Sequence, residues 1–173
     1  MDTSFLLTNG LGLAAFLTCL AAYTCKSDRH LKIAVLVGLL LWAAYYAVLG
    51  AMTAVGMALL LAARQGVSLA RHRLPASTLR GLFATFLLAF TANALLTWQG
   101  WLSLLPWVAS TLSTFAYLYL TGATLRKYIM AGDLAWAVYA VSADAWFHLV
   151  FLVCSTLLNV RAVQKLAPKA AAT

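Results

Sequence analysis

The sequence is a succession of apolar stretches separated by short polar or basic segments. Apolar residues make up 64% of the 173 residues and charged residues only 9%, far less charge than a soluble domain carries. A membrane-spanning helix needs about 20 largely apolar residues. Seven stretches qualify, several of them short, at about 4–24, 31–49, 50–69, 79–97, 102–120, 125–141 and 145–163. We therefore predict an all-α integral membrane protein with seven spans, forming a single membrane domain over residues 1–173.

The basic residues predict how the chain is oriented. A net charge of +8 can indicate a nucleic-acid partner, but here the basic residues form short clusters near alternate ends of the apolar stretches, and we expect no nucleic acid. With seven spans, all twelve fall on one side, while Asp2 and Asp144 fall on the other. The positive-inside rule then places the N-terminus outside and the C-terminus in the cytoplasm. The twelve are Lys26, Arg29, Lys32, Arg64, Arg71, Arg73, Arg80, Arg126, Lys127, Arg161, Lys165 and Lys169.

An internal repeat relates the first and last thirds of the chain. Residues 11–71 align without a gap on residues 105–165, an offset of 94. Identical pairs other than Leu and Ala are Tyr23/Tyr117, Gly38/Gly132, Trp42/Trp136 and Tyr45/Tyr139. Chance similarity between two apolar regions is the alternative. We predict two parallel three-helix bundles, residues 4–71 and 102–165, joined by a linker helix at 75–98 and followed by a flexible tail at 166–173.

Several short motifs, in order along the chain, carry a family resemblance. They are Gly10-x-Gly12-x-x-Ala15-Phe16, Leu104-Leu105-Pro106, Ser113-Thr114, Gly122-x-Thr124-x-Arg126 and Asn159. With them the chain resembles the YgjV family of bacterial inner-membrane proteins over nearly its whole length. The resemblance implies a multi-pass protein of the bacterial inner (cytoplasmic) membrane. It implies no established substrate.

The three-plus-one-plus-three organisation is also similar to that of the SWEET and PQ-loop transporters. That similarity implies a central sugar site lined by Trp and Asn from both bundles, to which Trp42, Trp136 and Asn159 could correspond. This chain departs from the pattern, because Gln65 stands where an Asn is expected and no Pro-Gln dipeptide occurs. Those departures weaken the implication of a sugar substrate.

Two charged residues lie inside the predicted hydrocarbon region. Asp133 follows Arg126 by seven residues and Arg64 precedes Arg71 by seven, so each lies about 10 Å from the cytoplasmic boundary. Such residues cost about 2.5–3.5 kcal/mol even on the insertion scale and usually face a partner or a cavity. Alternatives remain open for both: Arg64 can extend to the headgroups, and Asp133 can form a purely structural ion pair or hydrogen bond.

Helical spacing adds further candidates for the site. Asp133, Trp136 and either Tyr139 or Ala140 share one face of their helix. Span five has a polar stripe, which should turn away from lipid, although packing through small hydroxylated side chains would also explain it. Its members are Pro106, Ser110, Ser113 or Thr114, Tyr117 and Thr121. Trp98, Trp101 and Trp146 are interpreted as membrane-interface residues. The predicted substrate-binding residues are Asp133, Trp136, Asn159, Arg64, Trp42, Ser110 and Ser113.

No catalytic constellation is recognisable in the sequence. We therefore expect no enzyme activity and no cofactor. The three histidines and three cysteines lack the spacing of a metal site, so we also expect no metal. The predicted function is a small transporter or facilitator of a polar metabolite, with a sugar-like solute as one candidate. The alternative is a non-transporting scaffold or assembly protein, and a lipid-modifying enzyme comes third. The expected partners are the lipid bilayer and a small polar solute, and homo-oligomer formation stays open.

Overall fold

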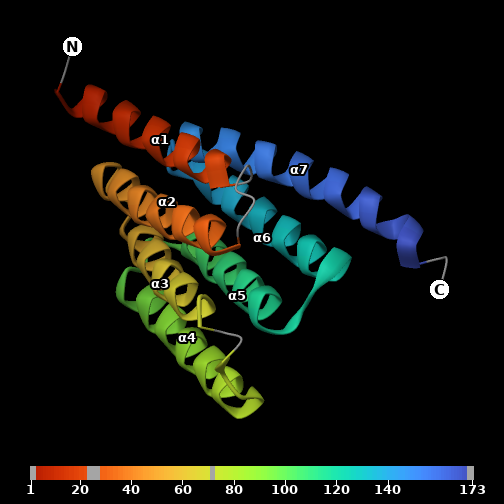
Figure 1. The fold of residues 1–173 in the computed structure, drawn as a ribbon. Helices are drawn as coiled ribbons and strands as arrows, with labels where there is room; N and C mark the ends of the chain where they lie inside the picture. The colour runs from red at the N-terminus through yellow and green to blue at the C-terminus, as the bar shows by residue number, and fades with distance from the viewer. Residues whose placement is uncertain (1–2, 23–27, 71–72, 171–173) are drawn as a thin grey trace.

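The computed structural model describes residues 3–22, 28–70 and 73–170, and within these ranges the chain is helical apart from its connections (Figure 1). The α-helices there are α1 (Thr3–Ala22), α2 (Asp28–Val48), α3 (Met52–Ser68), α4 (Ala76–Leu96), α5 (Leu104–Tyr119), α6 (Gly122–Ser142) and α7 (Trp146–Ala170), and a short 3-10 helix, η2 (Trp101–Ser103), precedes α5. The prediction of an all-α chain with seven helices is therefore confirmed. Predictions that involve Asp2, Tyr23, Lys26 and Arg71 lie outside the described residues.

Most helix boundaries lie within a few residues of the predicted ones. Pro106 falls in the first turn of α5, where an amide has no helical partner and proline is tolerated. The main difference is at the C-terminal end, where α7 continues to Ala170 and so enters the segment predicted as a flexible tail, 166–173.

Six helices form a ring around a central space, and α4 lies outside it. α1, α2 and α3 pack in sequence on one side, and α5, α6 and α7 pack in sequence on the other (Figure 1). α1 contacts α7 and α3 contacts α5, which closes the ring. α4 packs against both α3 and α5. The division into two three-helix bundles with a linker helix, and the parallel relation of those bundles, stay predictions.

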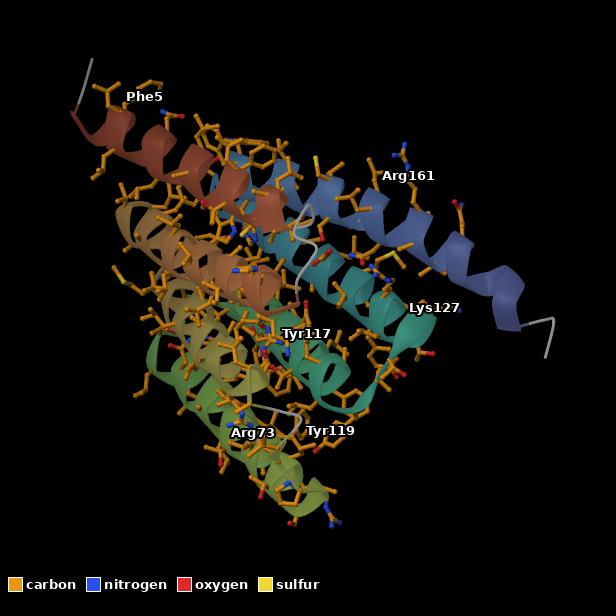
Figure 2. The ribbon with its side chains drawn as sticks, viewed as in Figure 1. Phe5, Arg73, Tyr117, Tyr119, Lys127 and Arg161 are labelled. Atoms are coloured by element: carbon orange, nitrogen blue, oxygen red, sulfur yellow. The ribbon has the colours of Figure 1, made fainter. Side chains whose placement is uncertain are left out.

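The connections divide between two ends of the ring. The α3–α4 and α5–α6 connections and the end of α7 lie at one end, and the two chain termini lie at opposite ends (Figure 1). Arg73 and Lys127 lie at those connections, and Arg161 is on the half of α7 toward the same end (Figure 2). We call this the basic end of the ring. Which end faces the cytoplasm stays a prediction from charge.

The outward surface of the ring and of α4 is strongly apolar. Leu88, Leu96, Leu134 and Leu157 are each at least 60% exposed. Large apolar surface of this kind suits contact with lipid rather than water. The apolar exterior therefore agrees with a chain that lies in a membrane.

Three of the described helices are long and apolar enough to cross a membrane by themselves: Phe5–Ala22, Ala76–Leu96 and Trp146–Gln164. Two apolar helices, Lys32–Val48 and Met52–Ser68, are shorter. α5 has 16 residues and rises about 24 Å, less than the ~30 Å hydrocarbon core. α6 has the length but carries Arg126, Lys127 and Asp133. The number of spans therefore stays a prediction, because it depends on short or charged helices.

The turns α2–α3 and α6–α7 have the same geometry, 94 positions apart. The amide of Ala51 donates to the carbonyl of Tyr46 at 3.0 Å, and the amide of Ala145 donates at 2.8 Å to the equivalent carbonyl of the later half. Gly50 has a φ of 72°, and Asp144, its equivalent, has a φ of 52°. Both turns thus use one residue in the left-handed region. Superposition of the complete halves stays a prediction.

The repeated glycines, Gly38 and Gly132, lie at close helix crossings. A Cβ on Gly38 would overlap the Sγ of Cys19, where α2 crosses α1. A Cβ on Gly132 would lie 3.2 Å from the carbonyl oxygen of Ala109, where α6 crosses α5. Glycine lets two membrane helices approach this closely. The same device therefore joins the first two helices of each half.

Candidate functional site

A cavity of about 140 Å³ lies at the centre of the ring. All six ring helices contribute to its wall, and α4 does not. Its aromatic lining includes Trp42 and Trp136. Its polar lining comprises Arg64, Ser113, Tyr117, Asp133, His148 and Ser155. We call this the central cavity.

Arg64 projects into the central cavity from the last turns of α3. Its side chain is only 4% exposed, and its Nε and Nη1 have no hydrogen-bond partner among the residues that the structure describes. The guanidinium carbon lies 4.3 Å from the centroid of the aromatic ring of Tyr117 on α5 (Figure 2). Stacking on an aromatic face stabilises a buried cation by about 0.5–2 kcal/mol. That is less than the several kcal/mol that removing an ion from water costs. Stacking on Tyr117 alone therefore does not offset the burial of the Arg64 charge.

Asp133 lies near the middle of α6 and belongs to a polar chain that continues on α7. The hydroxyl of Ser155 donates to Oδ2 of Asp133 at 3.0 Å. The amide nitrogen of Asn159 reaches the hydroxyl oxygen of Ser155 at 3.5 Å, and Arg126 donates to Oδ1 of Asn159 at 3.0 Å. This series of hydrogen-bonded side chains leads from the carboxylate of Asp133 at the central cavity toward the basic end, where Arg126 lies on α6.

Arg64 and Asp133 share the central cavity without a direct ion pair. Within the part of the chain that the structure describes, no guanidinium nitrogen of Arg64 lies within 4.0 Å of an oxygen of Asp133. The prediction that both face the interior agrees with their common cavity. Their charges are opposite, so the cavity as a whole is close to neutral when both are ionised.

A layer of aromatic side chains closes the central cavity at the end away from the basic connections. We call it the aromatic layer; it comprises Trp42, Tyr46, Trp136, Tyr139 and His148. The hydroxyl of Tyr46 forms a hydrogen bond with Nδ1 of His148. The Tyr46 ring lies 6.0 Å from Trp136 and 6.2 Å from Tyr139, centroid to centroid. Because all five side chains are buried, the layer separates the central cavity from the connections at that end.

Two further cavities lie on either side of the central one. The first, of about 220 Å³, shares Val35, Tyr117 and Ile129 with the central cavity and adds Arg126 and Asn159. We call it the basic-end cavity. The second, of about 240 Å³, lies beyond the aromatic layer and is lined by the α2–α3 and α6–α7 turns, η2 and Tyr139. The three cavities therefore follow one another through the ring, with the aromatic layer between the second and the central one.

A family model described as Imp-YgjV, bacterial inner membrane protein, matches residues 6–170. The chain belongs to this family. The resemblance read from the sequence motifs is thereby confirmed, and the family describes proteins of the bacterial inner membrane. Neither the curated proteins nor the solved structures include a match to the chain. The similarity to the SWEET and PQ-loop organisation stays a prediction.

Most of the predicted site residues of this YgjV-family chain meet in the structure. Those that line the central cavity are Asp133, Trp136, Arg64, Trp42 and Ser113. Asn159 lines the basic-end cavity instead, one helical turn beyond Ser155. Ser110 does not line the central cavity. It is completely buried and its hydroxyl has no hydrogen-bond partner among the described residues. The reason is helical spacing, since Ala109, Ser113 and Tyr117 follow one row of α5 and Ser110 belongs to the next.

His148, Tyr46 and Ser155 were absent from the predicted site. His148 and Ser155 line the central cavity of the YgjV-family chain, and Tyr46 bonds to His148 across its closed end. A signal was available in the sequence, because His148, Ser155 and Asn159 follow each other at steps of seven and four. Those steps place the three polar residues on one face of α7. Tyr46 had no such signal. The rotation of α2 about its own axis decides whether Tyr45 or Tyr46 faces His148, and the sequence does not give that rotation.

Proposed function

We propose that this protein is a small transporter or facilitator that carries a polar metabolite across the bacterial inner membrane through the centre of the helix ring. The observation that carries the proposal is the guanidinium of Arg64, buried against the central cavity with unfilled donors. Uncompensated buried charge is costly and in membrane helices marks solute or ion pathways. A solute that binds and leaves would pair with this charge for part of a transport cycle.

The series of cavities supports a path rather than an isolated pocket. The central and basic-end cavities share three lining residues, so a solute could move between them with little rearrangement. At the other end the aromatic layer lies between the central cavity and the next one. Side-chain rotation or a shift of α2 against α6 and α7 would connect the central cavity to the space beyond Tyr139. Such an arrangement suits alternating access around a fixed site.

A non-transporting scaffold or assembly protein is the second candidate. Its interior would need only to pack, and the efficient way to fill a ring of helices is with small and apolar side chains. The central cavity and its two opposite charges favour transport over this alternative. A sugar-like solute receives less support, because Asn159 lies at the basic-end cavity and away from Trp42 and Trp136.

Uptake into proteoliposomes tests the proposal. Purified full-length protein would be reconstituted and offered a panel of labelled sugars, amino acids and organic acids, with protein-free liposomes as the baseline. We expect at least one class of solute to enter faster than the baseline, and entry to fall to the baseline in Arg64→Gln. Arg161→Gln, at an exposed position of α7, is the matched control and should retain uptake. Folded wild-type protein that moves none of these solutes would contradict the proposal.

A further inference from the structure

The two charges of the central cavity indicate the class of solute. We infer that the cavity binds a small zwitterion, with its anionic group on Arg64 and its ammonium group on Asp133. This inference rests on the proposed function, because it names the solute of the proposed path. It is carried by the placement of two unpaired, opposite charges in one small cavity.

Arg64 provides the site for the anionic group. Nε and Nη1 are fully buried without a partner in the described part of the chain, so Nη2 is the guanidinium nitrogen left to face the central cavity. A hydrogen bond from a guanidinium N–H to a carboxylate oxygen is charge-assisted and about twice as strong as a neutral one. Tyr117 stacks against the guanidinium plane and holds it in place. A bound carboxylate would therefore accept a charge-assisted hydrogen bond from Nη2 and compensate a charge that the fold leaves unpaired.

Asp133 provides the site for the ammonium group. Its Oδ2 accepts the hydroxyl of Ser155, and the structure gives Oδ1 no partner among the described residues. The bond to Ser155, in turn linked to Asn159, fixes the direction of the carboxylate. A solute carrying only a negative charge would be repelled by Asp133. A solute carrying only a positive charge would leave Arg64 unpaired.

No direct ion pair joins the two charges that line the central cavity. If Arg64 and Asp133 served only to neutralise each other, the burial of both would favour direct contact. Among the residues that the structure describes, no nitrogen of Arg64 comes within 4.0 Å of an oxygen of Asp133. A zwitterion placed between them satisfies both groups and leaves the net charge of the cavity unchanged.

Volume limits the size of the solute. An engineered protein cavity of about 150 Å³ holds benzene, with six non-hydrogen atoms. The central cavity, at about 140 Å³, has room for a solute of similar size. L-Alanine has the same number of non-hydrogen atoms as benzene, and a hexose has about twice as many. Small amino acids therefore fit the central cavity in this conformation, and a hexose does not.

Calorimetric titration of the purified full-length protein in detergent tests the inference without requiring transport. The ligands are L-alanine, propionate, which lacks the amino group, and L-alaninamide, which lacks the carboxylate. We expect L-alanine to bind about tenfold more tightly than either analogue, or better, because each analogue loses one charge-assisted pair. Equal affinity for L-alanine and propionate would overturn the inference in favour of a simple anion site. No binding of L-alanine would also overturn it.

Two substitutions give a crossed pattern that a structural role would not produce. Asp133→Asn should weaken L-alanine binding by about tenfold or more, yet leave propionate binding unchanged or tighter, because the repelling charge is gone. Arg64→Gln should weaken L-alanine similarly and leave L-alaninamide unchanged or tighter. Asp144→Asn and Arg161→Gln, both exposed, are the matched controls and should match wild type. Loss of binding to all three ligands in a folded variant would contradict the assignment of that residue.

Folding is checked by thermal unfolding of each variant. If Arg64→Gln does not fold, Arg64→Lys replaces it and should keep the preference for L-alanine over L-alaninamide. The inference and the proposed function can fail separately. Binding of L-alanine without uptake of any solute would support the zwitterion site and contradict transport. Uptake of sugars by a protein that does not bind L-alanine would contradict the zwitterion site and support transport.

Discussion

The two halves of the chain, residues 11–71 and 105–165, share their packing but differ in their charges. Trp42 and Trp136 hold equivalent positions and both line the central cavity. Four residues before them, Gly38 and Gly132 form the close crossings of α2 on α1 and α6 on α5. The turns that follow α2 and α6 repeat the same backbone hydrogen bonds. What the halves have in common is therefore the means of building three packed helices.

The charged residues of the central cavity have no such equivalents. At the offset of 94, Arg64 corresponds to Leu158 and Asp133 corresponds to Leu39. Ser155, which bonds to Asp133, corresponds to Leu61. Each half thus supplies one charge and, at the matching position of the other half, an apolar side chain. If the predicted repeat is correct, its shared residues pack the helices of the ring, and the residues that differ between its copies line the candidate site.

The largest effect is expected from Asp133→Leu, which makes the later half match Leu39 of the first. Removing the carboxylate leaves the Arg64 charge alone in the central cavity and eliminates the ammonium site. Solute uptake by proteoliposomes should fall by about 100-fold or more, the loss expected for a charged pair in a desolvated site. Asp144→Asn, at the exposed α6–α7 turn, is the control and should retain uptake. Uptake that survives Asp133→Leu would mean that the difference between the halves has no functional role.

Arg64→Leu makes the first half match Leu158 and separates function from stability. Uptake should be lost, but the free energy of unfolding should not fall below that of wild type, because a buried charge without a direct ion pair is replaced by an apolar side chain. Unfolding in detergent, followed by tryptophan fluorescence, measures the stability. Marked destabilisation by Arg64→Leu would instead show that the guanidinium is a structural group of the fold.

Gly38→Ala tests the helix crossing that both halves share. The new Cβ meets the Sγ of Cys19, so the variant should lose about 1–3 kcal/mol of stability through overpacking. Adding Cys19→Ala to the Gly38→Ala variant should recover part of the lost stability, because it removes the Sγ that the new Cβ meets. The control is Gly81→Ala on α4, where no atom lies within 4 Å of the new Cβ. It should be neutral or slightly stabilising. Equal losses from Gly38→Ala and Gly81→Ala would refute the close approach.

The smallest effect is expected at the equivalent turn positions, Gly50 and Asp144. Asp144 holds a φ of 52°, which costs a non-glycine residue about 1 kcal/mol, so Asp144→Gly should stabilise by roughly 0.5–1 kcal/mol. Gly50→Ala, at a φ of 72°, should destabilise by a similar amount. Thermal unfolding of both variants measures the difference. Changes of the same sign in the two variants would show that the turns are not equivalent.

Sequence patterns were sufficient for the features that depend on periodicity and composition. Apolar runs predict the helices and the membrane class, and the motifs predict the family. The 94-residue offset pairs the two tryptophans, and the charges within apolar runs single out Arg64 and Asp133, all four of which line the central cavity. Ser110 and Asn159 were placed less well, because a step of one residue turns a side chain by about 100° and separates neighbouring rows. No sequence pattern gives that rotation reliably.

The aromatic layer could not be predicted for a different reason. His148 meets Tyr46 only because α7 closes the ring near α2, and these residues are about 100 positions apart in the chain. Contacts of this kind depend on how the two halves pack together. The repeat describes each half and carries no information about the contact between them. The position of His148 therefore required the structure.

Water access to the central cavity tests the central claim most directly. In a chain whose Cys19, Cys25 and Cys154 are replaced by serine, Ser113→Cys places a thiol on the cavity wall, and Leu134→Cys places one on the apolar outer surface. A charged methanethiosulfonate reagent reacts with thiolates, which form in water and not in hydrocarbon. The measurement is the labelling rate of the two variants in the membrane. We predict that Ser113→Cys is labelled much faster than Leu134→Cys and that L-alanine slows its labelling. Labelling of Ser113→Cys no faster than that of Leu134→Cys would mean a dry interior, and would contradict a solute path in favour of a scaffold.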